Sequence, residues 1–141
     1  MKTIVCLPLS KTSYEKSYLK DVNPLVLSFV GDGVHTLLIR ANTLEKSPYK
    51  NNELHAMTSK NVCATKQAAD SKNLLPFLNE EELFIYKKAK NAKTNSLPKH
   101  ATLMEYHLAT ALEAVIGYLY LSGQNERLEE LLLNIYPELG E

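Results

Sequence analysis

The chain has 141 residues, 45% hydrophobic and 23% charged, which is typical of a soluble globular protein and argues against a disordered one. Its formal net charge of zero argues against a protein that coats nucleic acid nonspecifically. Two cysteines are too few for a disulfide framework, and neither has a metal-ligand spacing. No apolar run suits a signal peptide or approaches the length of a membrane span. We therefore expect one cytoplasmic domain over residues 1–141, with residues 1–22 as a peripheral amino-terminal segment.

The first long helix is predicted to begin at Asn23 and Pro24, a capping side chain followed by a proline suited to the first helical position. It should run to about Leu44. Its sequence is apolar nearly all round, which predicts burial on several sides. A second helix is predicted over residues 52–70, where apolar residues recur at steps of three and four.

A third helix is predicted to begin after Asn79, because Glu82 lies three residues further on and completes a capping-box pattern. It should end near Ala92. Residues 93–101 contain turn formers and a proline, which predict an exposed loop.

The second central helix is predicted over Leu103–Leu121, with Thr102 and Glu105 forming a capping box and Gly123 ending it. A last amphipathic helix should follow, capped by Asn125. No segment of useful length alternates as a β-strand does, so the predicted fold class is all-α.

Two acids lie inside the predicted central helices, Asp32 in the first and Glu113 in the second. An ionised carboxylate in an apolar helix is costly unless it is paired or binds a cation. Small neighbours would let the two helix backbones approach and leave room for a hydrated ion: Gly31, Gly33 and Gly117. Oxygen ligands without a histidine or cysteine cluster favour Mg²⁺, for which Mn²⁺ can substitute. Structural acids bonded to hydroxyls or paired with Arg40 or a lysine remain the alternative.

Charge is unevenly distributed near the carboxyl-terminal half. Five lysines and no acid lie between Lys87 and His100, whereas five glutamates and one arginine lie between Glu126 and Glu141. Lysines bind a nucleic-acid backbone as point charges without reading its sequence. The alternative is that they form a solvated helix end, favourable near the negative end of the helix dipole. The lone His35 is more typical of a core or interface position, and we assign it no catalytic role.

Two segments resemble the signatures of the ribonuclease III family: VGDGVHTLLIR around Asp32 and ATALEAVIGYLYL around Glu113. The closer resemblance is to Mini-ribonuclease III, the catalytic domain without a double-stranded RNA-binding domain, and it spans about residues 23–133. The segment KKAKNAK resembles the family's basic stretch, and Leu54-His55 and Gln67-Ala68 resemble its second-helix motif.

The resemblance implies a two-fold symmetric homodimer that cleaves double-stranded RNA, with Asp32 and Glu113 as the catalytic and metal-binding residues and Mg²⁺ as the cofactor. It implies RNA contacts from six residues: Lys87, Lys88, Lys90, Asn91, Lys93 and His55. By analogy alone, the substrate would be the base-paired ends of precursor large-subunit (23S) ribosomal RNA. Leu25 and Phe29 are candidates for the dimer interface, and no further RNA-binding domain is expected beyond Glu141.

Departures from the family pattern concern the neighbours of the site. Ser28 and Thr110 stand where the full-length enzymes have further acids, a reduction that Mini-ribonuclease III shares. His35 and Thr36 replace an aromatic residue and an acid, and lysines replace arginines in the basic stretch. Two other functions stay open: a non-catalytic relative that binds structured RNA or ribosome-assembly partners, and a helical protein-interaction module whose acids are structural.

Overall fold

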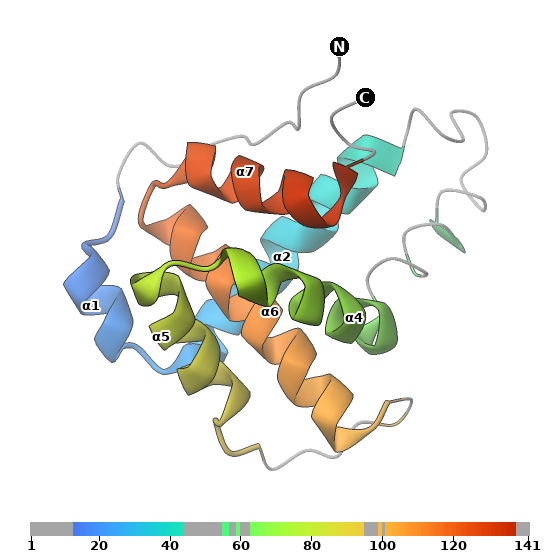
Figure 1. Cartoon of the computed structure of the whole chain (residues 1–141), viewed down its shortest axis with the longest axis horizontal. Coiled ribbons are helices and arrows are strands. Elements are labelled where there is room, and N and C mark those ends of the chain that lie inside the picture. The colour runs from blue at the N-terminus through green and yellow to red at the C-terminus, as the bar shows by residue number, and fades with distance from the viewer. Residues whose placement is uncertain are drawn as a thin grey trace.

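The computed structural model describes residues 13–43, 55–56, 59, 63–94, 99 and 101–137. Its elements are α1 (Lys16–Asp21), α2 (Pro24–Thr43), α4 (Ala64–Leu74), the short 3₁₀ helix η1 (Leu75–Phe77), α5 (Glu80–Lys90), α6 (Leu103–Leu121) and α7 (Asn125–Ile135) (Figure 1). No strand occurs in these described ranges, which confirms the all-α prediction.

Helix α6 is the centre of the fold. Thr102 and Glu105 form the predicted capping box, with hydrogen bonds of 2.9 and 3.1 Å, and Gly123 ends the helix region with a φ of 74°. Every residue from Leu108 to Leu119 except Glu113 is buried. Figure 1 shows α6 running diagonally through the molecule, with α7 across one end and α4 and α5 in front of it. Helix α6 is therefore the central helix that the sequence predicts over these residues.

Helix α2 packs along α6 more extensively than any other pair of elements, but it uses only part of its circumference. Leu27, His35 and Leu38 are buried, whereas Phe29 is 80% exposed. The prediction that α2 is buried on several sides is therefore wrong for the single chain, because no described segment covers the face that carries Phe29. Over Pro24–Asn42 the helix is long and apolar enough to span a membrane, contrary to the sequence expectation. The core helix of a soluble protein can have the same length and composition, so this feature is weak evidence for a membrane span.

The helix predicted over residues 52–70 is divided. Cys63 has extended backbone angles (φ −70°, ψ 155°), so α4 begins only at Ala64 and then continues to Leu74. Cysteine has a low helix propensity, which is consistent with the extended backbone at Cys63. Residues 51–54, 57–58 and 60–62 lie outside the described residues.

Helix α5 begins with the predicted capping box of Asn79 and Glu82, whose two hydrogen bonds measure 2.9 and 3.0 Å. The buried Glu82 carboxylate also accepts two hydrogen bonds from Arg127 of α7, each 2.9 Å long. This pairing joins α7 to α5. Asn125 is the first residue of α7 and Gln124 is its cap, so the predicted cap was wrong by one position.

Helix α1 attaches the amino-terminal part of the described chain to the core. Leu19 is buried, and the backbone N–H of Tyr14 donates to the carbonyl of Leu121 at 2.8 Å. The segment expected to be peripheral thus contributes to packing from Tyr14 onward.

Candidate active site

Helices α2 and α6 cross where neither backbone carries a side chain. A Cβ atom at Gly31 would overlap the backbone carbonyl of Glu113, and one at Gly117 would overlap the carbonyl of Leu27. The two helices therefore touch backbone to backbone, a separation that only glycine permits at these positions. Because Asp32 directly follows Gly31, the crossing brings it beside Glu113.

The sequence predicted that three glycines let the two helix backbones approach each other, and the structure shows this for Gly31 and Gly117. A Cβ at Gly33 would have nothing within 4 Å. Gly33 lies on the exposed side of α2, so its predicted part in the helix crossing was wrong.

Asp32 and Glu113 form a carboxylate pair at the edge of this crossing. Asp32 is exposed and Glu113 is half-buried, so Asp32 is not enclosed as its apolar sequence neighbours suggested. Burial, then a hydrogen bond to Asp32 and repulsion by its charge, raise the pKa of the Glu113 carboxyl to about 9. A protonated Glu113 that donates to Asp32 accounts for the hydrogen bond.

The pair has no basic partner among the described residues. Their ion pairs join other side chains, and neither carboxylate pairs with Arg40 or a lysine. No third aspartate, glutamate, histidine or cysteine of the described chain joins Asp32 and Glu113 in a cluster. Two converging carboxyl groups without a basic partner fit a hard divalent cation that keeps several waters, as Mg²⁺ does.

Small side chains flank the pair one turn before each acid. Ser28 and Thr110 are both buried, and the Thr110 hydroxyl donates to the Tyr106 carbonyl at 2.9 Å. These two positions therefore add no negative charge to the site.

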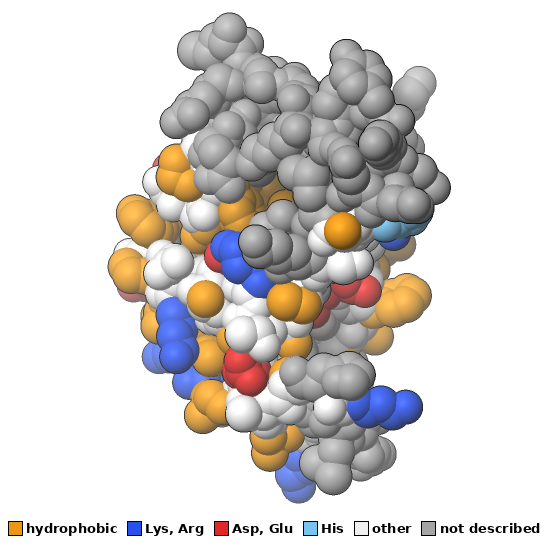
Figure 2. Space-filling model, turned by 90° about the vertical axis from the view of Figure 1, so that its right-hand side faces the viewer, with side chains coloured by type: hydrophobic (Ala, Val, Ile, Leu, Met, Phe, Trp, Pro, Cys, Tyr) orange, Lys and Arg blue, Asp and Glu red, His pale blue; other side chains and the backbone are white. Residues whose placement is uncertain are grey.

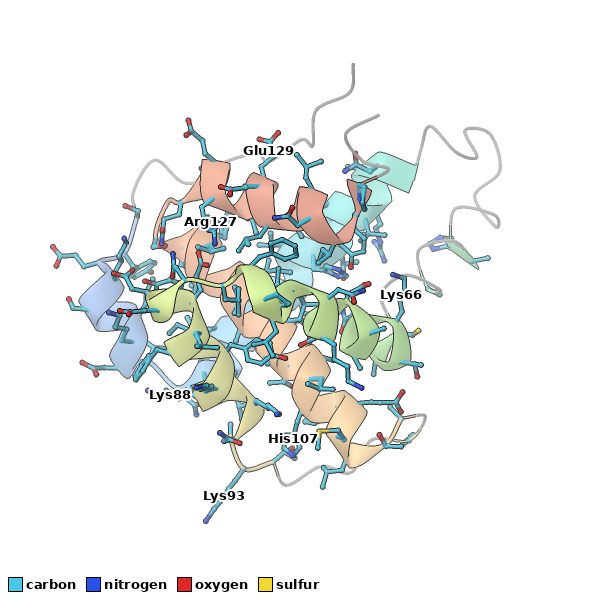
Figure 3. All side chains as sticks on the ribbon, viewed as in Figure 1. Lys66, Lys88, Lys93, His107, Arg127 and Glu129 are labelled. Carbon is cyan, nitrogen blue, oxygen red and sulfur yellow. The ribbon has the colours of Figure 1, made fainter. Side chains whose placement is uncertain are left out.

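The residues predicted to contact RNA differ in how exposed their side chains are. Lys87, Asn91 and Lys93 are exposed, as is His55, whereas Lys90 is half-buried. In Figure 3, Lys93 projects from the end of the molecule, away from Lys88. Figure 2 shows another face of the molecule, on which hydrophobic side chains lie between groups of basic ones.

Lys88 is already engaged within the chain. Its Nζ donates to the Lys20 carbonyl at 2.7 Å and lies 6.0 Å from the centre of the Phe84 ring. It therefore holds α1 against α5, which leaves its charge less available than that of Lys87 or Lys93.

The sequence reasoning missed the partners of His35. The ring is 1% exposed and lies between Gln67 of α4 and Tyr136, which follows α7. A core position was the expectation, and it is confirmed. Of the two partners, the sequence analysis singled out only Gln67, as part of the Gln67-Ala68 motif.

Comparison with known proteins gives a consistent assignment. The family model described as Ribonuclease III domain matches residues 25–124. Mini-ribonuclease 3 of Clostridium tetani is 40% identical over 129 residues, covering 89% of this chain and 85% of the relative. Mini-ribonuclease 3 of Brevibacillus brevis is 44% identical over 110 residues, covering 78% and 82%. A crystal structure of a Fusobacterium nucleatum protein matches with a TM-score of 0.75 and 36% identity, covering 84% of this chain and 94% of that one. The chain therefore belongs to the ribonuclease III family and, within it, to the Mini-ribonuclease 3 group.

Proposed function

We propose that this chain is a divalent-metal-dependent endoribonuclease that hydrolyses phosphodiester bonds in double-stranded RNA at Asp32 and Glu113. The enzyme class follows from membership of the ribonuclease III family. The observation that carries the site is the pair of carboxylates meeting at a backbone-to-backbone helix crossing, with no basic side chain of the described residues beside them.

Asp32 and Glu113 would hold Mg²⁺, for which Mn²⁺ would substitute. When bound, such a cation offsets charge developing on the phosphodiester and activates the attacking water. Glu113 would hold the cation in its deprotonated form, so the cation would compete with the proton between the two carboxyl groups. Asp32 is exposed, so a ligand can reach the pair from solvent.

The substrate is double-stranded RNA recognised by its shape and phosphates, since A-form helices offer little base information to side chains. Exposed Lys87, Lys93, Asn91 and His55 supply backbone contacts, with Lys90 beside them. Lys88 contributes least because it binds the Lys20 carbonyl. Base-paired ends of precursor 23S ribosomal RNA, in the cytoplasm, are the natural target that we propose.

A homodimer completes this proposal. Three large apolar side chains on one face of α2 are exposed: Val26, Phe29 and Leu37. A second copy packed on this face about a two-fold axis would cover them and place two sites on one duplex, so that both strands are cut.

The function is tested by incubating pure protein with a long RNA duplex, with and without Mg²⁺. The wild type should cut only with the cation, and Asp32→Asn and Glu113→Gln should each reduce cleavage at least about 100-fold. Both variants should keep their helix content, because an amide has the same size and shape as the carboxyl group that it replaces and no packing is lost.

Other outcomes identify the alternatives. Binding of the duplex without cleavage would indicate a non-catalytic RNA-binding relative, and neither binding nor cleavage would indicate a protein-interaction module. Cleavage that survives both substitutions would show that the site is elsewhere.

A further inference from the structure

A buried chain of hydrogen bonds joins α2 to α4 and to the residue that follows α7. His35 Nε2 lies 2.8 Å from the Tyr136 hydroxyl, which donates to Asp70 Oδ2 at 2.6 Å. Asp70 Oδ1 accepts from Lys66 Nζ at 2.6 Å, and Gln67 Nε2 lies 3.3 Å from His35 Nδ1. His35 and Asp70 are each 1% exposed, and Lys66, labelled on α4 in Figure 3, brings the chain to the surface.

The donors and acceptors in this hydrogen-bond network fix which atom carries each proton. Tyr136 gives its proton to the Asp70 carboxylate, so its oxygen accepts from His35 Nε2–H. His35 Nδ1 is then the acceptor for the Gln67 amide. This order requires a neutral ring, and burial, opposed by the charges of Asp70 and Asp32, lowers the pKa of His35 to about 4.

His35 lies one turn beyond Asp32 on the same helix, about 60° away around its axis. A ring bonded at both nitrogens therefore limits the rotation of α2 and with it the direction of the Asp32 side chain. The crossing of Gly31 and Gly117 fixes how close α2 and α6 lie. Buried Leu27 and Leu38 restrain the same rotation by packing, and the bonded ring adds a restraint that depends on hydrogen-bond direction.

We propose that Tyr136, acting through His35, is a positioning residue of the carboxylate site. Rotating α2 to turn Asp32 away from Glu113 breaks the buried bond between His35 and Tyr136, and buried polar groups left unpaired are costly. The network thereby keeps Asp32 aimed at Glu113. The inference rests on the proposed function for its catalytic consequence, whereas its geometric consequence concerns the metal-free chain.

The test compares Tyr136→Phe with Tyr86→Phe, each of which loses one buried hydroxyl. Tyr86 is a matched control because its hydroxyl lies 2.8 Å from Ser71 Oγ, and this hydrogen bond joins α4 to α5 and involves no residue of α2. Three quantities are measured: the ¹³C shifts of the Asp32 and Glu113 carboxyls without metal, the Mn²⁺ affinity by electron paramagnetic resonance, and kcat and KM for duplex cleavage.

Tyr136→Phe should move both carboxyl shifts, weaken Mn²⁺ binding about 10-fold and lower kcat about 10-fold, with KM for RNA within about twofold. Tyr86→Phe should leave all of these near the wild-type values even if its melting temperature falls as much. His35→Gln retains a donor for Tyr136 and should preserve most of the Mn²⁺ affinity, whereas His35→Leu should resemble Tyr136→Phe.

Equal effects of Tyr136→Phe and Tyr86→Phe on the shifts, Mn²⁺ affinity and kcat would overturn the proposal and leave the network a purely structural one. If Tyr136→Phe does not fold, identical Mn²⁺ affinities and shifts for His35→Gln and His35→Leu would overturn it. If the wild type cuts no RNA, the proposed function fails, but the carboxyl shifts still decide whether the network positions Asp32.

Discussion

At the scale of single residues, the cation site proposed at Asp32 and Glu113 differs from a structural ion pair. A structural acid would be paired with a base, as Glu82 is with Arg127. Instead, two acids share a hydrogen bond, and the pKa of Glu113 is raised. Keeping the buried Glu113 carboxyl protonated above its usual pKa lowers the stability of the metal-free chain at neutral pH.

Stability should depend on His35 in a defined pH range. An unfolded histidine has a pKa near 6.5, whereas burial lowers the pKa of folded His35 to about 4. As pH falls from 6.5 to 4 the unfolded chain gains the proton first, so the free energy of unfolding falls, by about 3 kcal/mol at pH 4. Above pH 6.5 this contribution does not change.

Urea unfolding between pH 7 and pH 4.5 measures the effect. His35→Gln cannot titrate and should show a shallower decline than the wild type, which isolates the histidine from the carboxylates. Superimposable pH profiles would contradict the assignment of a buried neutral ring.

At the scale of elements, the crossing of α2 and α6 determines the site geometry. Gly31 and Gly117 remove the side chains that would hold the helices apart. Glycine in a helix interior costs about 1 kcal/mol relative to alanine. That cost is offset here by contact between the two longest described helices.

Alanine substitution should therefore change the free energy of unfolding in opposite directions at Gly117, which lies in the crossing, and at Gly33, which does not. Gly117→Ala places a Cβ on the Leu27 carbonyl and should destabilise the chain by about 2–3 kcal/mol or more, with weaker cleavage because the carboxylates separate. Gly33→Ala meets nothing within 4 Å of the single chain and, with both glycine variants measured in a monomeric Phe29→Glu background, should stabilise it by up to about 1 kcal/mol. Denaturant unfolding of both variants measures the difference; an equal change in both would refute the close crossing.

At the scale of the whole molecule, the main feature is that α2 is buried on one side and exposes apolar side chains on the other. One side of this helix forms the core with α6, and the other exposes Phe29 with Val26 and Leu37. Exposed apolar residues gathered on one helix face are typical of an interface. The proposed homodimer accounts for a helix whose sequence is apolar nearly all round.

Phe29→Glu should convert the proposed dimer into monomers at micromolar concentration with helix content unchanged, because Phe29 is 80% exposed and packs little within its own chain. Phe84→Glu is a suitable control, since Phe84 is also an exposed phenylalanine but lies on α5. Sedimentation or light scattering measures the mass. A monomeric wild type, or a dimer that survives Phe29→Glu, would contradict the interface.

Local features could be predicted from the sequence because their partners are close along the chain. The capping boxes of α5 and α6 join residues three positions apart, and the glycine that ends α6 acts through its own backbone angle. The all-α class follows from apolar spacing. The break at Cys63 was missed because residues of low propensity are tolerated within many helices and tertiary packing decides the outcome.

The sequence by itself determined that two acids lie within two apolar helices, and so which residue types make up the candidate site. Only the tertiary structure decided that Gly31 and Gly117 are the point of contact, that Gly33 is not, and that Asp32 stays exposed. It alone joined His35 to Tyr136, 101 positions away. The physical reason is that helical periodicity reports which residues share a face, whereas pairing depends on how the faces of different helices pack.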